Sequence, residues 1–324
     1  MNPEFGLEIP TSRTEQYTVV LNGLCRIAES YFYAGRIDDS VHVLASGQQL
    51  ADSSDVQPRD LAALLICSGY VHAWRGSLIT GEYDIPFAIL NRAVQVAKAT
   101  RDEKLLARAL DTLGVTCYNH AMTLAEADFD TALSHFQQAL TLRETAHDQR
   151  GICESLFNIG LVAERKRKYD EALTAFTTVY STAKQQNYKS EMAGAARHLG
   201  FAHIRAGNLD QALDCFQEAQ LLIEETGQKI FLPFAQLSVG EVFHMQHKWK
   251  QAQQYSQMAY EIAQKMQIKR ASVQIAYSLG EVYEEQSNVD QAYAYYEIAC
   301  NLATAINFQL GITLCGAKLQ SRTQ

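Results

Sequence analysis

The sequence predicts an all-α solenoid, a stack of about seven helix–turn–helix repeats followed by a C-terminal capping helix. An apolar residue followed by glycine returns every forty residues, and an alanine follows each glycine by twelve residues. A fixed period of this length is the sequence signature of stacked repeats. The chain of 324 residues has only 5 prolines and 18 glycines, which leaves few turns for a β-rich fold. The glycines are Gly160, Gly200, Gly240 and Gly280, and the alanines are Ala172, Ala212, Ala252 and Ala292.

One repeat shows why each unit is a pair of helices. Apolar residues keep helical spacing up to Ala206, and Gly207 and Asn208 then break the pattern. A second helix follows, with Asp210 as a candidate capping residue. Glycine at 200 and alanine at 212 would let the two helices approach closely, and larger side chains there should force them apart. The apolar face of the second helix comprises Leu209, Leu213, Phe216, Ala219 and Leu222.

The start of the second helix recurs in five repeats. Each copy has an apolar or aromatic residue, an acidic or polar pair and then a small residue. These copies begin at Phe129, Tyr169, Leu209, Trp249 and Val289.

Two earlier copies are irregular. Ser40, Pro86 and Ala132 occupy corresponding positions, and each interval between them is 46 residues instead of forty. The six extra residues fall at 76–81, which we expect to form a longer loop, and at 120–128. The second segment contains no helix breaker, so we expect it to lengthen both neighbouring helices.

The combined pattern resembles the tetratricopeptide repeat, in the longer variant found in kinesin light chains and in bacterial Rap-type and MalT-like sensors. The resemblance implies a right-handed superhelix whose first helices line a concave groove. It places the solenoid at residues 15–324, after a disordered or tag-derived segment at 1–14. The implied repeats lie near 17–52, 58–100, 103–146, 149–187, 189–227, 229–267 and 269–306, and a cap lies at 307–324.

Composition excludes several functions. The net charge is −8 and the pI is about 5.6, whereas nucleic-acid or anionic-membrane binding needs a basic surface. The longest apolar runs, such as 61–67, are too short to span a membrane, and no signal-peptide pattern begins the chain. Seven scattered cysteines without a Cys-x-x-Cys motif indicate free thiols in a reducing compartment. We therefore expect a cytoplasmic protein without nucleic-acid or membrane partners.

The resemblance also implies which side chains face the groove, at fixed offsets from each repeat glycine. Arg165, Arg197 and Arg205 would form a basic centre, and the glutamates from Glu241 onward would form an acidic stretch. Aromatic anchors with separated charges suit a peptide or a partner's helix. The predicted groove residues are Tyr118, Asn119, Phe157, Asn158, Arg165, Arg197, His198, Phe201, Arg205, Glu241, His244, Tyr277, Glu281 and Glu284.

The function predicted from these residues is a non-enzymatic scaffold that binds a protein or peptide. The alternatives are a regulatory sensor acting in trans on a partner and a self-assembling structural protein, a possible homo-oligomer. The same charges could also form only solvated faces and salt bridges between repeats.

One cluster of residues has the composition of a metal site, but the sequence contains no common catalytic motif. Glu241, His244 and His247 share a helical face, and Glu281 and Glu284 would lie on the next repeat, as in carboxylate-bridged metal sites. Those sites are buried, whereas this face is expected to border an open groove. We found no phosphate loop, nucleophile elbow or His-Glu-x-x-His motif. The sequence therefore predicts no metal, no cofactor and no catalytic residue.

Overall fold

The computed structural model describes residues 12–124 and 126–321, and these residues form an all-α fold. Fifteen α-helices, a short π-helix (η1) and a short 3-10 helix (η2) follow one another along the described chain. The elements are α1 (Arg13–Tyr33), α2 (Ile37–Leu50), α3 (Pro58–Arg75), η1 (Gly76–Thr80), α4 (Asp84–Thr100), α5 (Glu103–Ala121), α6 (Asp130–Thr145), α7 (Gln149–Arg165), α8 (Tyr169–Gln186), α9 (Lys189–Arg205), α10 (Leu209–Thr226), η2 (Lys229–Phe231), α11 (Leu232–Met245), α12 (Trp249–Lys265), α13 (Lys269–Glu285), α14 (Val289–Ala305) and α15 (Gln309–Ser321).

Consecutive helices pack as antiparallel pairs, which confirms the predicted fold class. The repeat glycines make this pairing close. A Cβ atom at Gly200 would lie 2.5 Å from the Phe216 ring, and one at Gly280 would lie 2.4 Å from the Tyr296 ring. The bulky residue that meets the glycine is therefore four positions beyond the repeat alanine, on the facing helix.

Both irregular intervals differ from their predicted structures. Residues 76–80 do not form a loop but continue α3 as a π-helical turn, which ends at Gly81 with a φ of +78°. The segment 120–128 does not lengthen the helices, because α5 ends at Ala121 and α6 begins at Asp130. Here the Thr123 hydroxyl donates to the carbonyl oxygen of His120, and the Asp128 carboxylate accepts from the Asp130 backbone N–H. These side chains form hydrogen bonds with backbone groups between α5 and α6, so the segment is stabilised without being helical.

Helices α1 and α15 form the two ends of the stack. Ser12 caps α1, which starts at Arg13, so residues 12–14 of the segment predicted as disordered join the first helix. The rest of that segment lies outside the described residues, as does Arg322 of the cap. At the other end α15 packs on α14, and Lys318 donates to Glu284 at 2.6 Å. All seven cysteines are free.

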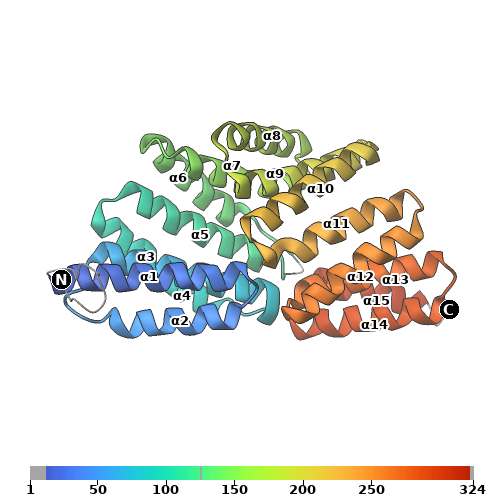
Figure 1. Ribbon diagram of the computed structural model, residues 1–324, viewed down its shortest axis with the longest axis horizontal. Coiled ribbons are helices and arrows are strands. Elements are labelled where there is room, and N and C mark those ends of the chain that lie inside the picture. Colours follow the sequence, from blue (N-terminus) through green and yellow to red (C-terminus); the bar gives the residue numbers. More distant parts are fainter. Residues whose placement is uncertain (1–11, 125, 322–324) are drawn as a thin grey trace, which may run out of the picture.

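The stack closes on itself. In Figure 1 the N-terminal helices α1–α4 lie on the left, α11–α15 lie on the right, and α6–α10 arch above both. The two sides share one hydrophobic core, which includes Phe32 from α1 and Ile275 from α13. The Phe231 ring of η2 lies 5.4 Å from Trp74 and 6.4 Å from Phe32, measured between centroids. We call this contact the seam.

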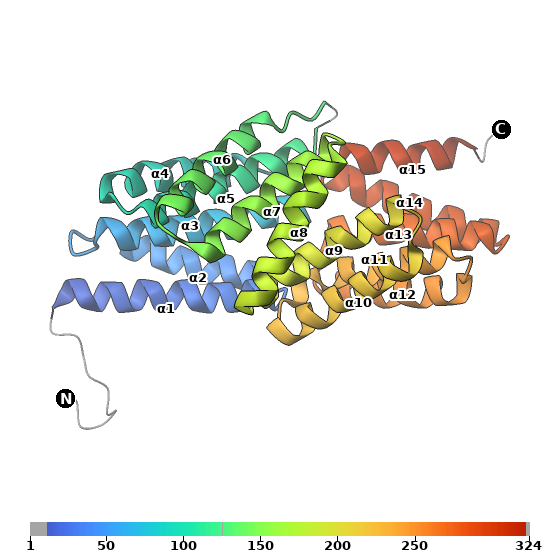
Figure 2. The same ribbon diagram turned by 90° about the horizontal axis from the view of Figure 1, so that it is seen from above.

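The middle repeats bridge the two halves. Helices α7–α9 cross the centre of the molecule, between the N-terminal and the C-terminal helices (Figure 2). The seam joins the N-terminal and C-terminal helices below α6–α10. The inner faces of the first helix of each repeat therefore surround a common space. Across the described residues, no helix combines the length and apolar character that crossing a membrane requires.

Candidate functional site

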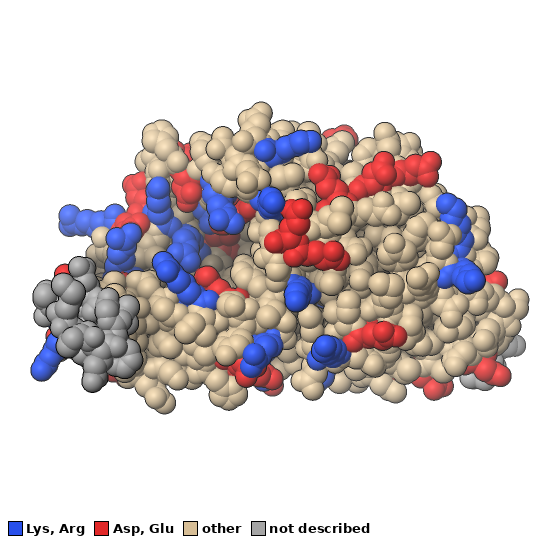
Figure 3. Space-filling model, in the orientation of Figure 1, with Lys and Arg blue, Asp and Glu red and all other residues tan. Residues whose placement is uncertain are grey.

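The space inside the closed stack is a cavity of about 590 Å³, which we call the central cavity. Its walls come from α1, α3, α5, α7, α9, α11 and α13, together with η1 and residues next to η2. Figure 3 shows a hollow on one face, with charged side chains of both signs around it. This volume is within the range of roughly 300–1,000 Å³ that is usual for ligand sites.

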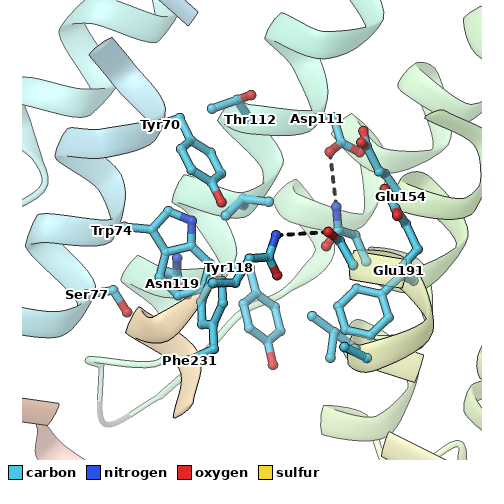
Figure 4. Close-up of a pocket in the computed structure, with 18 of the residues that line it drawn as sticks. Tyr70, Trp74, Ser77, Asp111, Thr112, Tyr118, Asn119, Glu154, Glu191 and Phe231 are labelled. Atoms are coloured by element: carbon cyan, nitrogen blue, oxygen red, sulfur yellow. Dashed lines mark hydrogen bonds between the residues drawn. The ribbon is translucent and has the colours of Figure 1, made fainter. Parts of the chain in front are cut away.

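One side of the central cavity is aromatic. Figure 4 shows Tyr70 and Trp74 on α3, with Phe231 beneath them. The Tyr70 and Trp74 rings lie 6.2 Å apart in an edge-to-face arrangement. Burial raises the pKa of Tyr70 well above its usual value, so its hydroxyl stays protonated. Rings of this kind provide rigid apolar contacts for a ligand.

The opposite side carries the carboxylates of Asp111, Glu154 and Glu191 (Figure 4), and one buried arginine binds two of them. The Arg143 side chain is only 1% exposed and reaches from α6 to the inner wall. Its guanidinium lies 3.2 Å from Asp111 and donates to Glu154 at 2.8 Å. The same group donates to the carbonyl oxygen of Gly151 and to the Ser155 hydroxyl, both at 2.7 Å.

Burial raises the pKa of both Asp111 and Glu154, although Arg143 acts in the opposite direction on each. Asp111 also accepts hydrogen bonds from Ser155 at 3.2 Å and from the Asn158 amide at 3.1 Å. These bonds hold both carboxylates in place. The Glu154 side chain is still 43% exposed.

Besides Arg143, four arginines line the wall: Arg108, Arg165, Arg197 and Arg270. Arg165 donates to the Tyr118 hydroxyl at 3.1 Å, and Arg197 donates to Ser238 at 3.2 Å. The Arg197 guanidinium also stacks over Phe201 at 4.8 Å, and that of Arg270 stacks over Phe308 at 4.4 Å. Burial lowers the pKa of Arg197 and of Arg270, and the nearby Arg165 adds to both shifts.

Four buried polar atoms of residues that line the cavity have no hydrogen-bond partner within the described residues. They are Nε1 of Trp74, Nδ2 of Asn119, Nε of Arg143 and Oε2 of Glu191. Buried polar atoms are rarely left unpaired, and a bound ligand or water is a common explanation. The lining of the central cavity therefore contains unpaired donors as well as an unpaired acceptor.

Half of the predicted groove residues line the central cavity; their role in binding stays a prediction. Asn158, one of the predicted groove residues, donates to Asp111 inside the wall. Phe157 packs against Phe176 and the Gly194 backbone. The residues that line the cavity are Tyr118, Asn119, Phe157, Asn158, Arg165, Arg197 and His198.

The other predicted residues do not line the central cavity. Arg205 donates to Glu164 at 2.9 Å, so it serves an inter-repeat ion pair instead of the expected basic centre. The same carboxylate is bonded to Nδ1 of His198 at 2.8 Å. Burial alone would raise the pKa of Glu164, but the bonds to His198 and Arg205 lower it to about 2. Phe201 packs on Phe216 within its own repeat.

The acidic stretch also lies elsewhere. Glu284 accepts from Lys318 at 2.6 Å and from the Tyr296 hydroxyl at 2.7 Å, so it is paired with α14 and α15 although its side chain is 44% exposed. Tyr277 packs on Tyr296. Burial raises the pKa of Glu241 to about 7 and also raises that of Glu281. The His244 ring lies 5.2 Å from Trp249. Within residues 12–124 and 126–321, no three His, Cys, Asp or Glu side chains converge as a metal site would require.

Sequence reasoning missed several wall residues, although a signal for them exists. Arg108, Glu154 and Gln274 each lie six residues before their repeat glycine, and Arg270 lies ten before Gly280. These offsets extend the groove-facing stripe by helical steps of three and four toward the start of each first helix. Trp74 of the seam lies five residues after Gly69, which is also a groove-facing offset, whereas Phe231 has no such signal.

Comparison with protein families matches the description "Tetratricopeptide repeat" at residues 118–185 and 191–265. The protein contains tetratricopeptide repeats. The matched ranges cover α5 from Tyr118 through α12, and the structure continues the same pairing before and after them. Comparison with curated protein sequences gives no match.

Solved structures share the tetratricopeptide-repeat fold over nearly the whole chain. Aspartyl phosphate phosphatase F from Bacillus subtilis is 13% identical, with a TM-score of 0.54 over 94% of this chain and 97% of that one. A Rap protein complexed with Competence and Sporulation Factor is 13% identical, with a TM-score of 0.59 over 95% and 97%. NprR in complex with its cognate peptide NprX is 11% identical, with a TM-score of 0.62 over 91% and 80%. At these identities the likeness concerns the fold alone.

Proposed function

We propose that this protein is a non-enzymatic receptor that holds a short peptide in the central cavity. The observation that carries the proposal is the closed stack, which turns the inner faces of the repeats into a bounded cavity of about 590 Å³. A volume of this size suits a few extended residues better than a long partner helix.

The chemistry of the wall supports a peptide. Tyr70, Trp74 and Phe231 provide apolar contacts, and the unpaired Asn119 donor and Glu191 acceptor match the two polar groups of a peptide unit. Charges of both signs suit an amphoteric ligand. The Rap and NprR structures with bound partners are consistent with binding by this fold.

The seam favours a receptor that acts as a sensor, which would regulate a separate partner protein when the peptide binds. A ligand in the central cavity touches both the N-terminal and the C-terminal walls, so its binding would bias the seam toward closure. Self-assembly stays an alternative, because α15 exposes Leu310 and Leu314 at the end of the stack.

Filling the central cavity tests the proposal. Val115 is half-buried on α5 and lines the cavity, so Val115→Trp should block a ligand sterically. We expect wild-type protein, equilibrated with a defined pool of synthetic hexapeptides and desalted, to retain a subset that mass spectrometry identifies. Val115→Trp should retain those peptides at least tenfold less.

Val289→Trp is the matched control, because Val289 is 51% exposed on the outer helix α14. It should retain the same peptides as the wild type. Equal retention by Val115→Trp and the wild type would place any peptide site outside the central cavity, and no retention by the wild type would count against a peptide ligand.

A further inference from the structure

Three of the five arginines that line the central cavity come from three different repeats. Arg165 is on α7, Arg197 on α9 and Arg270 on α13. Among the ion pairs that the described residues form, none includes any of these three arginines. The carboxylates nearest to Arg197, those of Glu164 and Glu241, act on it only at longer range.

Arg270 is the most confined of the three. The residue is 8% exposed and lines the central cavity, and its guanidinium contacts the face of Phe308 at 4.4 Å. Within the described chain it donates no side-chain hydrogen bond and forms no ion pair, whereas Arg143, which is also buried, has four acceptors. A buried charge is normally paired, so this contrast points to a missing partner.

The surroundings concentrate positive charge. Burial lowers the pKa of Arg270, and the Arg165 guanidinium lowers it further by repulsion, while the hydroxyls of Tyr83 and Tyr118 act in the opposite direction. Asn119, next to Tyr118 on α5, adds an unpartnered N–H donor to the same wall. Guanidinium groups with amide donors bind carboxylate and phosphate oxygens through paired hydrogen bonds.

We propose that Arg270, Arg165 and Arg197, with Asn119, form an anion subsite in the central cavity that binds a carboxylate or phosphate group of the ligand. The Asp111 and Glu154 carboxylates are paired with Arg143 and not with these three arginines, so the wall keeps charges of both signs and the subsite gives the ligand a direction. If the ligand is a peptide, this assignment rests on the proposed function, and its acidic side chain or C-terminal carboxylate occupies the subsite.

Isothermal titration calorimetry with inorganic phosphate and with two tetrapeptides tests the subsite. The peptides are Ala-Tyr-Phe-Ala with a free C-terminus and the same sequence with a C-terminal amide. We expect at least one of phosphate and the free peptide to bind the wild type, and to bind Arg270→Gln and Arg165→Gln at least tenfold more weakly. Arg92→Gln is the control, because Arg92 is exposed on α4 and lies outside the cavity wall.

The outcomes distinguish a carboxylate ligand from a phosphate ligand, and they test the anion subsite separately from the peptide function. A tenfold preference for the free peptide over the amide supports a carboxylate ligand. Phosphate binding without peptide binding supports a small anionic molecule and removes the peptide function while the subsite stands. Equal affinity in the wild type and both arginine variants, or no binding of any probe, overturns the subsite.

A second readout keeps the test informative if anion affinity is low. In buffer without phosphate or carboxylate, Arg270→Met should melt at a higher temperature than the wild type, because it removes an uncompensated buried charge. A lower melting temperature for Arg270→Met, with unchanged anion binding, would contradict the proposal.

Discussion

Replacing Arg143 with leucine is expected to lower the free energy of unfolding by about 3–5 kcal/mol, the cost of breaking a buried ion pair by removing one partner. The Arg143 side chain is 1% exposed and connects α6 to Asp111 on α5 and to Glu154 and Ser155 on α7. Its loss leaves the Asp111 carboxylate buried without a counterion. Urea unfolding followed by circular dichroism measures the effect.

A double variant separates pairing from packing. Arg143→Leu with Asp111→Leu removes both charges, so we expect it to lose less stability than the sum of the two single variants. Additive losses would show that the two residues are not coupled.

Replacing Phe231 with alanine is expected to open the seam. Phe231 packs against Trp74 and Phe32, which come from the other side of the closed stack. Truncating a half-buried phenylalanine should cost about 2–3 kcal/mol, below the roughly 3–5 kcal/mol of a fully buried one. Because the seam holds the halves together, small-angle X-ray scattering should also show a larger radius of gyration.

Phe136→Ala is the control for this experiment. Phe136 is fully buried between α5 and α6 and does not touch the seam. We expect it to lose as much stability or more without a change in the radius of gyration. If Phe231→Ala keeps the wild-type scattering curve, Phe231 does not hold the seam closed.

The repeats could be predicted from the sequence because their contacts are local. Each glycine meets the residue sixteen positions later, as Gly200 meets Phe216, so the forty-residue period fixes the pairing. The same period places Phe157 and Asn158 on the inner face. The described helices accordingly follow the predicted succession of pairs, from α1 to the final helix α15.

The closure of the stack could not be predicted in this way. Trp74 and Phe231 are far apart in the chain, and their contact depends on the small rotation of every repeat between them. The π-helical turn η1 (Gly76–Thr80) also contributes to the closure, because it packs against α13. Sequence reasoning treated that segment as a loop. From the repeat architecture it also expected an open groove, with Arg205 and Glu284 as contacts.

The central claim is that the ligand binds inside the closed stack, and tryptophan fluorescence tests it most directly. The chain has 2 tryptophans, Trp74 in the cavity wall and Trp249 outside it. In Trp249→Phe, a peptide retained by the wild type should shift or quench the emission of Trp74 in a saturable way. In Trp74→Phe, the same peptide should leave the emission of Trp249 unchanged. A response from Trp249 with none from Trp74 would contradict binding in the central cavity.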